Sequence, residues 1–97
     1  MMPPLEANHA AYRPTGLINR ASQKDPMSIS EVAAFLQKAM DHFEWLLDRE
    51  GIQREIMDTL ESAVFYAQRL FGELDFPGTQ RALLSYFNTA TSAGVTY

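Results

Sequence analysis

The chain has 97 residues, no cysteine and a formal net charge of −4. This length predicts one domain at most, and the lack of cysteine excludes a disulfide, a thiolate zinc site and a cysteine nucleophile. The negative charge disfavours DNA or RNA as the main ligand, because an acidic surface repels phosphate backbones. We find neither a signal-peptide core nor an apolar run near the roughly 18 residues of a membrane span. We therefore expect a cytoplasmic protein that makes no membrane contact.

Residues 1–27 predict an extended or disordered N-terminal arm. Four of the five prolines lie there, and each biases the residue before it toward extended geometry. The arm has three basic and two acidic residues, against five basic and ten acidic residues in the rest of the chain. We expect Leu17 and Ile18 to anchor the arm on this subunit, on a second copy or on a target. The sequence also allows translation to start at Met27.

A capping box marks the start of a helical domain at residues 28–97. Ser28 and Glu31 have the spacing at which each side chain bonds the other residue's backbone amide. Met27 and Val32 stand at the two positions of a hydrophobic staple. This signal separates the arm from the helical body.

Apolar residues at three- and four-residue steps predict one helix over residues 29–50 and another over residues 53–73. The first apolar stripe comprises Ile29, Val32, Leu36, Met40, Phe43 and Leu47, widened by Phe35, Ala39 and Leu46. Gly51 is placed as the C′ residue of the first helix, with Ile52 as its apolar C″ contact. Extrapolated through Gly51, the two stripes differ by roughly 120° of helical rotation. We therefore expect a break there and an antiparallel helical hairpin.

A shorter third helix is predicted over residues 80–91, after a turn at residues 75–78. Thr79 is the expected cap. The fold class is thus all-α: a hairpin, a short third helix and an N-terminal arm. The chain has many aromatic residues for so small a core, so we expect two copies to pair into a helical bundle.

No residue pattern indicates catalysis, a cofactor or a metal. His42 has Lys38, Ala39, Trp45 and Leu46 at the neighbouring helical positions, and none of these is a metal ligand. We expect His42 at the boundary of the apolar stripe. Phosphate-binding glycine loops and a nucleophile elbow are absent from the sequence, so we expect a protein without enzymatic activity.

Two aromatic residues fall on the polar sides of the predicted helices, and each has an arginine four residues later. These pairs are Trp45 with Arg49 and Phe65 with Arg69. Stacking of arginine on the rings is favourable, and aromatic and arginine side chains are enriched where proteins bind proteins. We expect these four residues, together with Leu17 and Ile18, at a partner interface.

The arm, the capped helix start at Ser28, the break at Gly51 and the acidic body with Trp45 and Phe65 give a layout that resembles the small antiactivators of bacterial quorum sensing. The resemblance rests on layout and carries no sequence motif. It implies a mostly helical, often dimeric protein. It also implies binding to an acyl-homoserine-lactone receptor, which keeps that transcription factor off DNA.

The preferred hypothesis is a small regulatory protein that forms a homodimer and masks a surface of another protein, with a transcription factor as the candidate partner. The alternative is a nucleic-acid-binding protein that uses its third helix. Gln80, Arg81, Ser85 and Asn88 are placed to reach bases in that case, but only Arg81 is basic.

Overall fold

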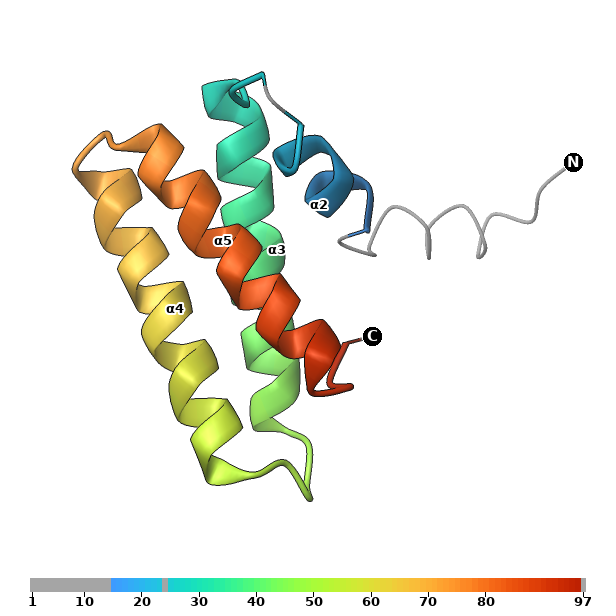
Figure 1. Ribbon diagram of the computed structural model, residues 1–97. Coiled ribbons are helices and arrows are strands. Elements are labelled where there is room, and N and C mark those ends of the chain that lie inside the picture. Colours follow the sequence, from blue (N-terminus) through green and yellow to red (C-terminus); the bar gives the residue numbers. More distant parts are fainter. Residues whose placement is uncertain (1–14, 24, 97) are drawn as a thin grey trace, which may run out of the picture.

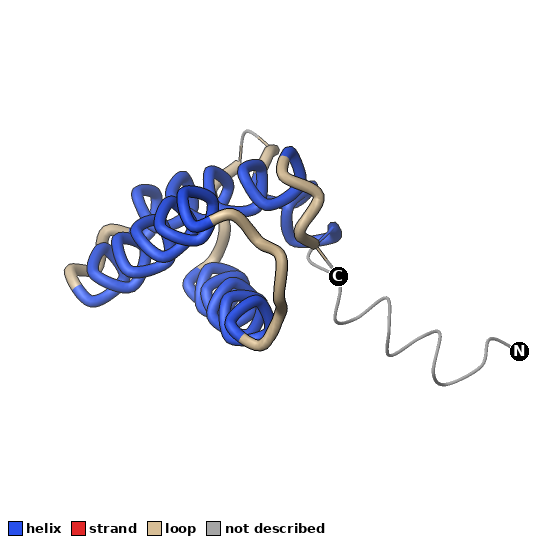
Figure 2. The backbone as a smooth tube through the Cα atoms, turned by 90° about the horizontal axis from the view of Figure 1, so that it is seen from below, coloured by secondary structure: helices blue, strands red, loops and turns tan. Residues whose placement is uncertain are grey.

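The computed structural model describes residues 15–23 and 25–96, and in these ranges the fold is all-helical. Its helices are α2 (Thr15–Ala21), α3 (Ile29–Leu47), α4 (Arg54–Gly72) and α5 (Phe76–Ser92). The three long helices alternate in direction, and α2 lies against α5 (Figure 1). Helices α4 and α5 form the most extensive contact, and α3 packs across this pair (Figure 2). None of the described helices combines the length and apolarity needed to cross a membrane.

Six of the seven buried residues of α3 belong to the predicted stripe, and the centre of the buried face is rotated from the centre of that stripe by roughly 35°, at 100° per residue. Ile29 and Leu47, at the ends of the predicted stripe, are about 60% exposed. The buried α3 residues are Val32, Phe35, Leu36, Ala39, His42, Phe43 and Leu46. Phe35, a residue of the predicted stripe, stacks on Phe87 of α5 with 5.3 Å between ring centroids. The core therefore includes an aromatic contact between α3 and α5, beside the buried residues of α4.

Most of the aromatic side chains in the described residues pack in or against the core of their own chain. Phe35, Phe43, Tyr86 and Phe87 are buried, and Trp45, Phe71 and Phe76 are partly buried against the same core. The surplus of aromatic residues therefore does not by itself require a dimer.

The predicted capping box at the start of α3 is confirmed. The Glu31 amide donates to Ser28 Oγ at 3.1 Å, and the Ser28 amide donates to Glu31 Oε1 at 3.0 Å. The Ser28 amide is the main cause that lowers the pKa of the Glu31 carboxyl below its ordinary value. Arg20 of α2 also donates to Glu31, from Nε to Oε2 at 2.8 Å. The cap thus joins two helices.

The expectation of an extended arm is wrong for Thr15–Ala21, which forms α2; residues 1–14 lie outside the described residues. Gln80 of α5 holds the end of this helix, because its Nε2 donates to the Ala21 carbonyl at 2.7 Å and its Oε1 accepts from the Met27 amide at 3.1 Å. Ala21 and Met27 are buried in the core. A seven-residue helix is marginal alone, so these contacts with α5 account for α2.

The predicted break between the first two long helices is confirmed, but Gly51 does not end the first of them. Helix α3 ends at Leu47, and Asp48 is its C-cap. Gly51 lies further along the loop with φ of +83°, a conformation that favours glycine. The expected pairing of Gly51 at C′ with Ile52 at C″ is therefore wrong.

The expected turn at residues 75–78 is also wrong, because these residues begin α5. Asp75 is the N-cap, and its Oδ1 accepts from the Gly78 amide at 2.9 Å. Pro77 lies in the first turn, where a helix needs no amide donor. Thr79, the expected cap, donates instead to the Asp75 carbonyl at 2.7 Å and is buried.

Helices α4 and α5 end in the same backbone motif with different residues at C′. The C″ amide bonds the C3 carbonyl in both: Asp75 to Leu70 at 2.9 Å, and Val95 to Ala90 at 3.0 Å. The C′ residue then takes a left-handed conformation. Gly94 has φ of +71°, whereas Leu74 has φ of +63° and carries a side chain there.

The Leu74→Gly variant should increase the free energy of unfolding by about 0.5–1 kcal/mol, because a side chain at positive φ is strained. Leu74 is 73% exposed, so little packing is lost. Urea unfolding followed by circular dichroism measures the change. The Gly94→Ala variant is the matched control and should lose about 1 kcal/mol at the equivalent position. A less stable Leu74→Gly protein would contradict the assignment of strain.

Candidate functional site

A fully buried polar side chain, His42, connects three segments of the described chain. Its Nδ1 lies 2.7 Å from the Tyr86 hydroxyl of α5, and its Nε2 lies 2.8 Å from the Val95 carbonyl beyond α5. A carbonyl oxygen only accepts, so Nε2 donates to Val95. In the neutral imidazole, Nδ1 therefore accepts from the Tyr86 hydroxyl. Both ring nitrogens of His42 are thus satisfied.

The expectation of a boundary position for His42 is wrong. The side chain is fully buried and packs edge-on against the Tyr86 ring, with centroids 5.6 Å apart. Burial lowers the pKa of His42 below its ordinary value of 6.5, and the hydrogen bond to Val95 acts in the opposite direction. The neutral form is thus favoured, and the geometry indicates a structural bridge within the core.

Trp45 lies half-buried beside this bridge. Its ring is 5.6 Å from that of His42 between centroids, and the described core includes Trp45 among its partly buried neighbours. The predicted stacking with Arg49 is confirmed, since Cζ of Arg49 lies 4.7 Å from the Trp45 ring centroid. A small cavity of about 70 Å³ lies between Trp45 and the C-terminal residues Val95 and Thr96. Trp45 therefore helps to cover the end of α5.

Phe65 and Tyr66 are adjacent on α4 and more exposed than Trp45. Phe65 is 56% exposed and Tyr66 is 51% exposed. Arg69 does not take the expected place at Phe65: its Cζ lies 5.7 Å from the Tyr66 ring centroid, and its Nε lies 3.6 Å from Glu73 Oε2. Two large rings thus stand in solvent at the middle of α4.

A groove of about 500 Å³ runs between α4 and α5 beside Tyr66. Ala63 and Ala82 are among its lining residues, and Arg81 and Asp75 supply charge. Asp75 already accepts from the Gly78 amide, whereas no ion pair of Arg81 is found among the described residues. The small side chains of Ala63 and Ala82 leave this α4/α5 groove open. Tyr66 and Arg81 line the same groove, where they can contact a partner.

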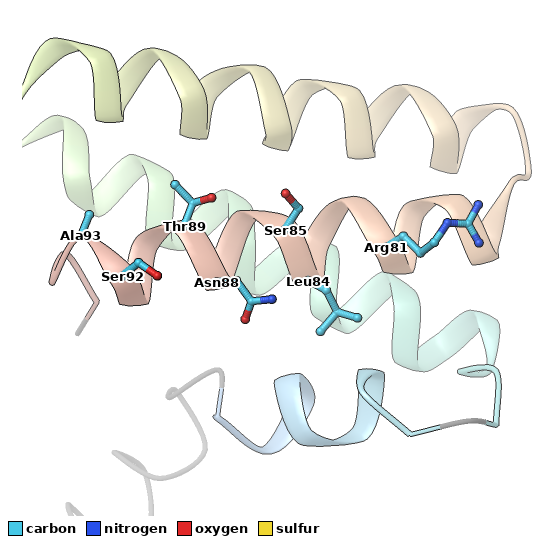
Figure 3. A pocket seen from close by; sticks show the side chains of 7 residues that line it. All are labelled: Arg81, Leu84, Ser85, Asn88, Thr89, Ser92 and Ala93. Atoms are coloured by element: carbon cyan, nitrogen blue, oxygen red, sulfur yellow. The ribbon is translucent and has the colours of Figure 1, made fainter.

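The outward face of α5 continues from the groove through polar residues (Figure 3). Ser85 and Thr89 lie toward α4, and Leu84 and Asn88 lie toward α2 (Figure 3). Arg81 is the only charged residue on this face. Gln80, expected beside these residues in a nucleic-acid reader, instead binds the α2 end.

The structure does not gather the six expected interface residues at one place. Leu17 and Ile18 are half-buried against the core of their own chain. Of the three anchoring sites expected for these residues, the structure therefore shows the one on the same subunit. Trp45 and Arg49 lie beside the C-terminal segment, and Phe65 and Arg69 are exposed on α4.

Sequence reasoning missed Tyr66 and Arg81 as neighbours on one groove, because they lie on different helices. Their connection depends on the α4–α5 pairing, for which the sequence has no local signal. Among the described residues, no cluster of three or more histidine, aspartate or glutamate side chains is placed to hold a metal ion. Comparison of the chain with protein-family models, with curated proteins and with solved structures gives no match.

Protonation of His42 should destabilise the fold as the pH falls. Because its folded-state pKa is lowered, the unfolded chain binds more protons below pH about 6.5. The free energy of unfolding is then highest above this pH and falls by at most about 1.4 kcal/mol per pH unit on acidification. Urea unfolding between pH 7.5 and 5.5 measures the slope.

The control for this measurement is His42→Gln, which keeps a polar side chain that does not titrate in this range. The variant should be less stable at pH 7.5, with a smaller dependence on pH. Equal slopes in the two proteins would show that His42 does not supply the pH dependence.

Proposed function

We propose that this chain is a non-enzymatic regulatory protein that binds a larger protein and masks part of its surface. The observation that carries the proposal is the adjacent pair Phe65 and Tyr66, both more than half exposed at the middle of α4. Large rings exposed to water lose apolar hydration when a partner covers them. Aromatic and arginine side chains are also enriched at protein interfaces.

The α4/α5 groove supports a protein partner, because both apolar and polar side chains line it. We assign to it a helix or loop of the partner that inserts an apolar side chain over Ala63 and Ala82. Such a segment would also carry a carboxylate to meet Arg81, which forms charge-assisted bonds with carboxylates. Tyr66 would close over the inserted side chain and contribute both ring and hydroxyl contacts.

The resemblance in layout to quorum-sensing antiactivators suggests the class of partner. We propose an acyl-homoserine-lactone receptor transcription factor, held off DNA by the masking of its dimerisation surface. The protein would act in the cytoplasm as a homodimer. In this proposal, the helical hairpin holds α4 at the surface, where a partner can bind it.

Nucleic-acid binding through α5 has less support. The outward face of α5 offers Arg81 as its one charged residue, whereas phosphate binding usually needs several cations. Gln80 is occupied by its bonds to α2.

Photo-crosslinking in the native host tests the proposal. A photoreactive phenylalanine analogue at Tyr66 should capture one larger protein that mass spectrometry identifies as a receptor transcription factor. The same analogue at Asp41, exposed on α3, should not capture it, because α3 does not line the groove. Capture at Asp41 alone, or no heterologous product at Tyr66, would contradict the proposal.

Once the partner is identified, its affinity for the Arg81→Ala variant gives a quantitative test of the proposal. Arg81 is exposed, so its loss should leave the melting temperature nearly unchanged and weaken binding about tenfold, the effect of losing one charge-assisted bond. Isothermal titration calorimetry measures the affinity. The Arg54→Ala variant, exposed at the far end of α4, is the control and should bind as the parent protein does.

A further inference from the structure

We propose that the outer face of α4 is the homodimer interface of this chain, formed by two antiparallel copies of α4 about a two-fold axis. This deepens the proposed function, on which it rests, by naming the surface and orientation of self-association. The central line of this face comprises Asp58, Ser62, Phe65 and Arg69, all of them exposed. They lie opposite the buried residues Leu60, Val64 and Ala67 of the same helix.

The spacing of these four residues suits a helix–helix contact. Steps of four, three and four residues place them on one line along a helix. Phe65 supplies an apolar knob, and Ser62 supplies a small residue that lets a second helix approach. A two-fold axis between them sets Phe65 of each copy opposite Ser62 of the other, as the isologous geometry of a symmetric dimer requires.

The charges on this line complement themselves in the antiparallel orientation. The axis that pairs Phe65 with Ser62 also brings Asp58 of each copy level with Arg69 of the other. Parallel helices would instead set Asp58 against Asp58 and Arg69 against Arg69. Within one chain, the ion pair of Arg69 with Glu73 is exposed and 3.6 Å long, and an exposed pair costs little to rearrange.

The charges also select the register. Sliding one copy by a helical turn in one direction sets Arg54 level with Arg69 of the other copy. The opposite slide sets Asp58 level with Glu73. Like charges repel in both displaced registers, so only the register centred between Ser62 and Phe65 pairs opposite charges along this line.

The other exposed faces lack this property. The outer face of α3 carries Asp41, Glu44 and Asp48, and self-pairing would bring acids together. The outward face of α5 has Arg81 as its only charged residue. Among the three long helices, only α4 has an outer face that is complementary to a second copy of itself.

The two-fold axis has a consequence for the α4/α5 groove. A two-fold axis perpendicular to the plane of the two antiparallel α4 helices places the same side of each helix on the same face of the dimer. Ser62 lies on the central line and also borders the groove, and Tyr66 and the rest of the groove lie on one side of that line, so both grooves would open on one face of the dimer. A dimeric partner would then meet two binding sites at once.

Sedimentation equilibrium of the purified full chain tests the interface. A contact of one helix pair buries less than a standard interface, so we expect dimerisation with a Kd on the order of 10–100 µM. Asp58→Arg alone and Arg69→Asp alone should each weaken it at least about tenfold, because each replaces two attractions by two repulsions. Circular dichroism verifies that both variants keep their helical content.

Mixing the two single variants gives the decisive measurement. In a mixed pair, the two substituted side chains face each other with opposite charges, and the unchanged Asp58 of one chain faces the unchanged Arg69 of the other. The mixture should therefore form a heterodimer with affinity near that of the parent protein, although each variant alone stays monomeric. Asp41→Arg on α3 is the control for the change in net charge and should dimerise as the parent does.

A monomeric parent protein at 500 µM, about five times the upper expected Kd, would overturn this interface. So would a dimer that neither substitution weakens, or a mixture that fails to associate. None of these results removes the crosslink of Tyr66 to a larger protein, which tests the proposed function separately. Conversely, if that crosslink does not form, sedimentation can still show a dimer with the pairing of Asp58 and Arg69.

Discussion

The hydrogen bonds of one buried imidazole set the arrangement of this small core. His42 binds a side chain of α5 and a backbone carbonyl beyond α5 at the same time. A buried polar group without partners costs about 1–3 kcal/mol, so both bonds must form together with the packing around them. The left-handed turn at Gly94 leads the backbone to Val95, whose carbonyl accepts from the imidazole. The rotation of α3 and the partial cover of Trp45 accompany this bridge.

The N-terminal end of the core is held by side chains from two other helices. Arg20 reaches from α2 to the capping carboxylate of α3, and Gln80 reaches from α5 to both sides of the loop after α2. These bonds hold α2 against the core, at the end where α3 begins. As a result, the chain covers its own aromatic centre without a second copy.

Among the described residues, the exposed aromatic side chains, Phe65 and Tyr66, are both on α4. One flank of α4 borders the groove with Tyr66 and Arg81, and its outer line carries Phe65 between opposite charges. The two surfaces serve different purposes in the proposed function: the groove holds a segment of the regulated protein, and the outer line joins two regulators. The two surfaces meet at Ser62, and the groove extends from there toward α5, away from the outer line of α4.

The sequence by itself determined the helical class, the capped start of α3 and the break between α3 and α4. These features arise from contacts within a few residues, such as the reciprocal bonds of Ser28 and Glu31. It also placed Phe65 on a polar side, because helical periodicity fixes that position. Only the tertiary structure decided that His42 is buried, that Thr15–Ala21 is helical and that Tyr66 borders the same groove as Arg81. The first two depend on partners far away in the chain, Tyr86 for His42 and Gln80 for Ala21, and the third depends on the pairing of α4 with α5; no local pattern specifies such pairings.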